Sequence, residues 1–106
     1  MENSSELLHH VFFWLNNPSS EEDLNRLIKG VKGLREIDPQ KKVNVGVPAK
    51  TPKRDVIDDS YDVSLLISFN SVEEHDAYQD HPLHHKFIDE CASLWKKVQV
   101  YDSQDV

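Results

Sequence analysis

The stretch SYDVSLLISFNSVEEHDAYQDHPLHHKF, residues 60–87, decides the fold because its hydrophobic pattern changes partway along. Apolar and polar residues alternate over residues 61–69, and this period of two predicts a β-strand. The residues on its apolar face are Tyr61, Val63, Leu65, Ile67 and Phe69. Helical periodicity replaces the alternation after this segment, so the strand leads directly into a helix.

The helix that follows this strand has a clear start and an interruption. Ser71, with Glu74 three residues later, matches a capping box and predicts a helix that runs through Tyr78. Pro82 disfavours helical geometry at the residue before it, so we expect a break at that point. The helix is then expected to resume and to continue to about Lys97.

An earlier helix is predicted between the first two strands. Ser19 and Glu22 form another capping box, and the helical pattern fades between Gly33 and Pro39. Its apolar residues recur at helical spacing and form one stripe, which comprises Leu24, Leu27, Ile28, Val31 and Leu34.

The remaining elements complete the order β-α-β-β-α-β. Further strands are predicted at residues 7–15, 42–47 and 98–102. Residues 48–60 form a loop that is long for a compact domain. The order matches the split βαβ, ferredoxin-like motif, an α+β fold in which one sheet carries two helices on one face. We expect residues 1–106 to form a single domain with a core at about 7–103.

The first predicted strand, LLHHVFFWL, is apolar on both faces. Alternation places His10 with Phe12 and His9 with Val11, but periodicity alone does not say which face meets the helices. A strand that is apolar on both sides should be covered on both sides. Helices can cover one face of the sheet, and a second subunit can cover the other.

Composition narrows the class of function. The chain has 106 residues, a formal net charge of −7 and a single cysteine, so an intrachain disulfide is excluded. The acidic balance and the lack of a basic stripe disfavour nucleic acid and anionic membranes as partners. Cys91 lies on an apolar stripe and is expected in the core. The N-terminal segment lacks the features of a signal peptide or a membrane span, so we expect a cytoplasmic protein.

Histidines are the candidate functional residues, because three of the six lie within residues 81–85. The apolar residues of the last helix form a stripe that begins at Phe87 and continues through Cys91. His84 lies three residues before Phe87, so it falls on the same face of the helix. We therefore expect His84 to face the sheet, either as a hydrogen-bonded core residue or beside a cavity. His81 is expected to fix the turn before the proline, while His75 and His85 are expected at the surface.

A metal site is not expected from these spacings. His81 and His84 make an i, i+3 pair to which His75, His85 or His10 could add a ligand. Zinc sites usually need three or four convergent ligands, and the proline makes the spacing non-standard. The chain also has no glycine-rich loop of the kind that cradles phosphates, so no cofactor is expected.

Three segments together resemble one protein family. HHVFFWL, the stretch over residues 60–87 and VQVYD look like the stress-responsive dimeric α/β-barrel (Dabb) proteins, and the resemblance spans residues 7–103. Its most specific part is the pattern Y-x-x-H-P-x-H, formed here by Tyr78, His81, Pro82 and His84. A histidine on the first strand, here His10, is the second marker.

The resemblance implies a ferredoxin-like protomer and a homodimer. Two protomers would pack their sheets face to face into a barrel, with the helices outside. The dimer core would then hold Leu7, His9, Val11 and Phe13. The space between sheet and helices, with its ligand pocket, would be lined by His10, Phe12, Val63, Leu65, Ile67, His81, His84 and Phe87.

One branch of the family, similar to the plant polyketide cyclase of the cannabinoid pathway, performs an intramolecular aldol condensation without a metal. The resemblance implies that His84 acts as the base and Tyr78 as its partner, with His10 completing the site. An imidazole near neutrality can take a proton from a methylene between two carbonyls. A phenol can donate to the developing enolate oxygen. This chain departs from that branch at Val63, where the cyclase has another histidine.

Three functions remain open from the sequence. The first is a dimer that binds a small aromatic or polyketide-like carbonyl compound in an apolar helix–sheet pocket, with cofactor-free acid–base chemistry. The second is a non-catalytic stress-response dimer whose histidines stabilise the helix–sheet junction. The third is a cofactor-independent monooxygenase acting on an electron-rich aromatic compound, which rests on analogy of fold alone.

Overall fold

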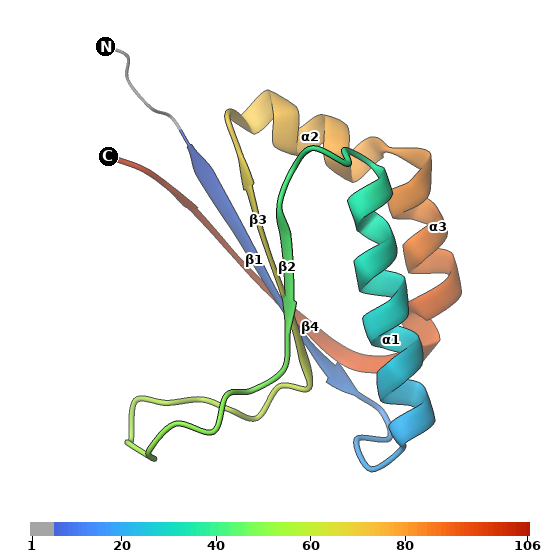
Figure 1. Cartoon of the computed structure of the whole chain (residues 1–106), viewed down its shortest axis with the longest axis vertical. Helices are drawn as coiled ribbons and strands as arrows, with labels where there is room; N and C mark the ends of the chain where they lie inside the picture. Colours follow the sequence, from blue (N-terminus) through green and yellow to red (C-terminus); the bar gives the residue numbers. More distant parts are fainter. Residues whose placement is uncertain (1–5) are drawn as a thin grey trace.

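An antiparallel sheet with helices on one face forms the molecule (Figure 1). The computed structural model describes residues 6–106. The strands are β1 (Leu7–Leu15), β2 (Val43–Gly46), β3 (Val63–Phe69) and β4 (Trp95–Gln104). Their order in the sheet is β2-β3-β1-β4, and all neighbours are antiparallel.

The helices follow the predicted β-α-β-β-α-β order, with the second helical region divided in two. They are α1 (Glu21–Gly33), α2 (Val72–Asp80) and α3 (Pro82–Cys91), with the short 3₁₀ helices η1 (Leu34–Glu36) and η2 (Ala92–Leu94). The predicted ferredoxin-like α+β fold is confirmed. Within residues 6–106, the helices are too short or too polar for any of them to cross a membrane.

Serine side chains cap two of the helices, and one predicted cap is corrected. The hydroxyl of Ser71 accepts a hydrogen bond from the backbone N–H of Glu74 at 3.0 Å, which confirms the start of α2. The cap of α1 is Ser20 and not Ser19, because the Ser20 hydroxyl accepts from the backbone N–H of Asp23 at 3.1 Å. The Ser19 hydroxyl bonds an asparagine side chain in the preceding loop instead.

The proline interrupts the second helical region as predicted. His81 separates α2 from α3 with extended backbone angles, φ −65° and ψ 139°. Its Nδ1 accepts a hydrogen bond from the backbone N–H of Leu83 at 3.0 Å. His81 therefore caps α3 and fixes the turn before Pro82, and the two helices leave this turn in different directions (Figure 1).

The predicted end of the second helical region is wrong. The helix was expected to reach Lys97, but β4 already begins at Trp95. Trp95 pairs with Leu15 and Lys97 pairs with Trp14, with an irregularity in the register between them. Pairing with β1 satisfies the backbone groups of these residues, and this outweighs their local helical spacing.

The helices cover the face of β1 that carries His9, Val11 and Phe13. Every second residue from Leu7 to Leu15 is buried on this face. The buried residues of the neighbouring strand β3 are Val63, Leu65, Ile67 and Phe69. These two rows pair across the sheet and form the core together with the inner sides of the helices.

This arrangement corrects the predicted assignment of faces. His10 and Phe12 were expected beneath the helices and His9 in the dimer core, and the structure reverses both placements. His10 pairs with Leu66 and Phe12 pairs with Ser64, so their side chains lie on the face without helices. The same reversal applies to Leu7, Val11 and Phe13.

Helices α1 and α3 approach each other closely at Gly30. A Cβ atom at Gly30 would lie only 2.5 Å from the Sγ atom of Cys91, so this contact requires a residue without a side chain. Cys91 is buried, as expected for a core residue.

Candidate functional site

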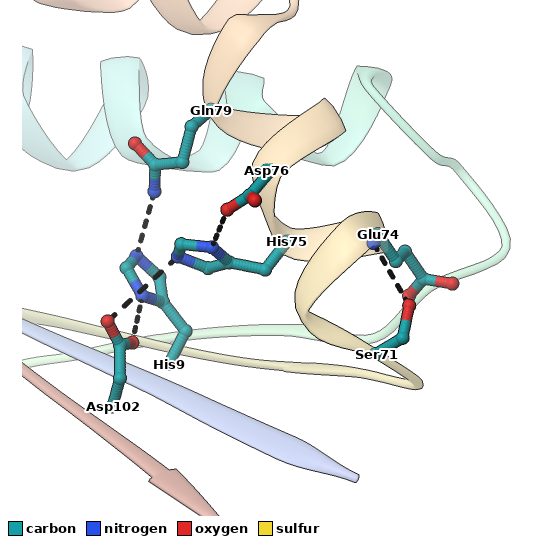
Figure 2. A network of polar contacts seen from close by, with 7 residues as sticks. All are labelled: His9, Ser71, Glu74, His75, Asp76, Gln79 and Asp102. Atoms are coloured by element: carbon teal, nitrogen blue, oxygen red, sulfur yellow. Dashed lines mark hydrogen bonds and ion pairs between the residues drawn. The ribbon is translucent and has the colours of Figure 1, made fainter. Parts of the chain in front are cut away.

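A buried histidine and a carboxylate meet where β1 and β4 lie side by side. His9 and Asp102 are direct partners in the register of these two strands. Asp102 Oδ1 lies 2.5 Å from His9 Nδ1 (Figure 2). His9 is buried, whereas the side chain of Asp102 is 41% exposed. The pair therefore links the core to solvent at an edge strand of the sheet.

Gln79 of α2 contacts the other ring nitrogen of His9. Its amide nitrogen lies 3.4 Å from His9 Nε2 and donates to it, so the Nδ1 atom carries the proton that is donated to Asp102. Burial lowers the pKa of His9, while the hydrogen bond and the charge of Asp102 act in the opposite direction. Because burial has the larger effect, the imidazole is neutral at pH 7.

His75 of α2 packs against His9 instead of lying at the surface. Its side chain is 16% exposed, and its ring centroid lies 4.9 Å from that of His9. Nδ1 of His75 lies 3.1 Å from Asp76 Oδ1, whereas Nε2 is buried and has no hydrogen-bond partner within residues 6–106. The predicted surface position is wrong because His75 and Tyr78, three residues apart on α2, both turn toward the sheet.

Tyr78 and His84 lie in contact across the break between α2 and α3. Their ring centroids are 5.1 Å apart. The Tyr78 hydroxyl is buried, and it has no hydrogen-bond partner in the part of the chain that the structure describes. Burial raises the pKa of the Tyr78 phenol well above its usual value, so the hydroxyl stays protonated.

His9, and not His10, is the histidine of the first strand that lies near this pair. The ring centroids of His9 and Tyr78 are 6.2 Å apart. His10 instead packs against Phe12 on the opposite face of the sheet, with ring centroids 4.3 Å apart. The structure therefore brings Tyr78 and His84 together and separates His10 from them.

His84 is half-buried in the first turn of α3. Burial lowers its pKa from the ordinary value of 6.5, and electrostatic interaction with the nearby histidines His85, His9 and His75 lowers it further. The imidazole is therefore neutral at pH 7, and in that form it can accept a proton.

The predicted pocket residues lie in separate places. Ile67 and His81, together with Tyr78, line a cavity of about 220 Å³ beside α2, next to the ion pair of Lys41 with Glu74. The ammonium group and the carboxylate of that pair are 2.7 Å apart. Lys41, Glu74 and Tyr78 therefore line the same cavity between the sheet and the helices.

The other six predicted pocket residues do not line this cavity. His10 and Phe12 lie on the opposite face of the sheet, and His84 lies in the first turn of α3 outside the lining. Val63 and Leu65 are buried in the core. Phe87 is buried as well and lines a groove of about 630 Å³ between α1 and α3.

Asp102 and Gln79 belong to the site although the sequence did not single them out, and His9 belongs to it although it was expected in the dimer core. Alternation groups His9 with Val11 and Leu15, but both faces of this strand are apolar, so the pattern did not show that this face meets the helices. Asp102 lies within VQVYD, but its pairing with His9 depends on a register that periodicity does not give.

The arrangement offers two kinds of chemistry. Tyr78 and His84 present a hydroxyl donor beside a neutral base, which suits proton transfer. His9, His75 and Asp102 present one ligand atom each within 4.8 Å of one another, which suits a metal ion.

Comparisons with known proteins agree with this architecture. The sequence model of the Dabb family, described as the stress responsive A/B barrel domain, matches residues 7–105. A comparison with curated proteins finds no significant match. Solved structures, in contrast, match along nearly the whole chain.

Three of these structures show the range of the fold. A Dabb family protein with a ferredoxin-like fold from Mesorhizobium loti is 20% identical, with a TM-score of 0.74 over 96% of this chain and 98% of that one. A dimeric ferredoxin-like protein from Thermobifida fusca is 16% identical, with a TM-score of 0.75 over 99% and 95% of the two chains. A hydroxynitrile lyase from Passiflora edulis is 18% identical, with a TM-score of 0.76 over 98% and 96%. Likeness at these identities shows the fold alone.

Proposed function

The chain belongs to the stress responsive A/B barrel domain (Dabb) family, and we propose that it is a homodimer that binds a small aromatic or polyketide-like carbonyl compound beside Tyr78 and His84. In this proposal His84 takes a proton from the bound compound. One observation carries the proposal: the buried Tyr78 hydroxyl lacks a hydrogen-bond partner within residues 6–106 and lies beside a neutral imidazole.

The unpaired Tyr78 hydroxyl supports a binding role. A buried donor left without a partner costs about 1–3 kcal/mol, so most such groups in proteins are paired. A carbonyl oxygen of a bound compound would accept this hydrogen bond. When a proton leaves the neighbouring carbon, that oxygen gains negative charge, so the hydrogen bond strengthens as the reaction proceeds.

His84 supports the catalytic part of the proposal. Its lowered pKa leaves the imidazole unprotonated at pH 7, which is the form that a general base needs. The proton of the C–H bond would move to the imidazole, and the electron pair of that bond would move into the enolate. Tyr78, whose raised pKa keeps its proton in place, would stabilise the enolate as a hydrogen-bond donor.

The sheet face without helices supports the homodimer. Leu8 is 42% exposed and Tyr101 is 62% exposed, and Phe12 lies between Tyr61 and Tyr101 with ring centroids 4.8 and 6.1 Å away. A second protomer would cover this apolar and aromatic surface, and two sheets packed face to face would close the barrel. The neighbouring Thermobifida fusca protein is described as dimeric.

A non-catalytic dimer is the second candidate, and the packing of the histidines favours it. His9, His75 and Tyr78 surround Phe69 with ring centroids 6.1, 5.4 and 5.1 Å from it. These aromatic contacts give the histidines a role in stability without any reaction. The Passiflora edulis hydroxynitrile lyase is an enzyme of this fold, but fold alone does not assign a function.

A thermal-shift screen separates the two candidates. Wild type, His84→Ala and the control His85→Ala, which changes the exposed histidine next in sequence, would be tested with acetophenone, benzoylacetone and related aromatic ketones. The proposal predicts that a compound raises the melting temperature of wild type and of the control but not of His84→Ala. It also predicts that unliganded His84→Ala melts close to wild type. A strongly destabilised His84→Ala, with no compound shifting the wild type, would favour the non-catalytic dimer.

A further inference from the structure

We propose that His9, His75 and Asp102 form a binding site for a divalent transition-metal ion of the zinc type. The site goes beyond the proposed function, because none of its ligands belongs to the Tyr78–His84 pair. One ligand atom of each residue lies within 4.8 Å of the other two. On a tetrahedral Zn²⁺ ion with ligands at about 2.0–2.2 Å, neighbouring ligand atoms are roughly 3.3–3.6 Å apart. Small rotations of the three side chains would therefore bring their ligand atoms to the separations that an ion requires.

Each of the three ligands comes from a different element of regular structure. His9 and Asp102 are register partners on β1 and β4, and His75 reaches them from α2 above the sheet (Figure 2). Nε2 of His75 lies 4.0 Å from Asp102 Oδ2. Ligands held by strands and a helix keep their relative positions better than ligands on loops.

His75 has the hydrogen-bonding pattern of a metal ligand. Its Nδ1 lies 3.1 Å from Asp76 Oδ1, so the proton is on Nδ1 and the lone pair is on Nε2. That Nε2 atom is buried, faces the cluster and has no hydrogen-bond partner in the described chain. Histidines that bind metal ions usually donate their other N–H to a carboxylate in this way.

His9 can change from a hydrogen-bond donor to a ligand without a change of charge. Without an ion, its Nδ1 donates to Asp102 at 2.5 Å and its Nε2 accepts from Gln79. With an ion on Nδ1, the proton resides on Nε2, and the Gln79 amide turns its oxygen toward that N–H. Asp102 must move away from Nδ1 to make room, which the 41% exposure of its side chain allows.

The donor set points to a borderline transition metal and not to magnesium or calcium. Two imidazoles and one carboxylate suit zinc, cobalt and their neighbours, whereas magnesium and calcium prefer oxygen ligands only. The carboxylates of Asp102 and Asp76 supply the negative charge that a divalent ion needs. Three protein ligands leave a fourth position for water, on the solvent-exposed side of Asp102.

Calorimetric titration of the full chain tests the site directly. Metal-stripped protein without an affinity tag would be titrated with ZnCl₂ and, separately, with MgCl₂. We expect one zinc per chain and no binding of magnesium. CoCl₂ should give the visible absorption bands of four-coordinate cobalt.

Asp102→Asn keeps the shape of the side chain but removes its charge. We expect Asp102→Asn and His75→Ala each to weaken zinc binding by at least about 100-fold.

Two further variants make the test specific. Asp76→Asn, which alters only the partner of His75, should weaken zinc binding by about 10–100-fold. His85→Ala, a change at an exposed histidine, should leave it unchanged. The proposal is overturned if wild type binds no zinc at micromolar concentration, or if zinc binding survives in both Asp102→Asn and His75→Ala. Since no carbonyl compound is present in these titrations, they are independent of the proposed function.

Discussion

At Tyr78 the ring and the hydroxyl have different energetic consequences. The ring centroid lies 5.1 Å from that of Phe69 and 5.1 Å from that of His84, so its burial stabilises the fold. The hydroxyl is buried in the same place without a partner in the described chain, so it contributes nothing favourable until a ligand binds.

Tyr78→Phe removes that hydroxyl and keeps the ring. The free energy of unfolding of the unliganded protein should stay the same or rise by up to about 1 kcal/mol, because an unpaired buried donor is lost. Urea denaturation at pH 7 measures this change. A decrease larger than about 1 kcal/mol would show that the hydroxyl is paired in the native protein and would remove the main support for a ligand there.

Three histidines make the stability of the protein depend on pH. The pKa values of His9, His10 and His84 lie below the ordinary value of 6.5, and burial is the largest cause for each. Below pH 6.5 the unfolded chain therefore binds more protons than the folded chain, so the free energy of unfolding should decrease as the pH is lowered through this range. Well above pH 6.5 the three histidines are neutral in both states, so the free energy of unfolding no longer depends on their protonation.

Denaturation in urea at several pH values between about 5 and 8 checks this dependence. His84→Gln should flatten the decline below pH 6.5, because one of the three groups is removed. His85→Gln, an exposed control, should leave the slope of wild type unchanged. Equal slopes in wild type and His84→Gln would show that His84 is not shielded from protonation in the folded state.

At the scale of secondary structure, local patterns locate most elements to within two residues but miss the start of β4. Alternation over residues 61–69 located β3, which begins two residues later, at Val63, and ends at Phe69 as predicted. Ser71 marked the start of α2. Both signals act within a few residues. Residues 95–97 were expected to continue the helix, yet they form the start of β4. Their state depends on pairing with β1, a partner about 80 residues away in the chain, which no local pattern contains.

The candidate site was predicted in part for the same reason. Tyr78 and His84 belong to one short motif, and the break at Pro82 between them can be recognised from the sequence. His9 and Asp102 are separated by 93 positions, and only the strand register brings them together. Alternation told which residues share a face of β1, but not which face the helices cover.

Gly30→Ala tests the close packing of α1 against α3. Alanine normally favours a helix over glycine by about 1 kcal/mol, but here the new Cβ would lie 2.5 Å from Cys91 Sγ. We expect the free energy of unfolding to fall by about 1–3 kcal/mol, as overpacked cores do.

Gly33→Ala is the matched control on the same helix. No atom would lie within 4 Å of a Cβ there, so this change should raise stability by up to about 1 kcal/mol. Chemical denaturation of both variants against wild type gives the comparison. A Gly30→Ala variant as stable as Gly33→Ala would mean that the two helices are farther apart than described.

At the scale of the whole molecule, the sheet has one face covered by helices and one face that we propose is covered by a second protomer. Sedimentation at micromolar concentration should therefore give about twice the chain mass of 12.3 kDa. Phe12→Glu should give monomers, because a charge buried in an apolar interface is costly. Val56→Glu, in a loop where the side chain is 78% exposed, should remain dimeric. A wild-type monomer at these concentrations would contradict the barrel.

The central claim is proton transfer between His84 and a bound carbonyl compound. The most direct measurement is deuterium exchange in D₂O, followed by NMR, at the carbon beside the carbonyl of the ketone that stabilises wild type most. We predict that wild type and His85→Ala accelerate the exchange over buffer, and that His84→Ala does not, although it is folded. Equal exchange rates in wild type and His84→Ala would contradict the claim and leave the non-catalytic dimer as the better account.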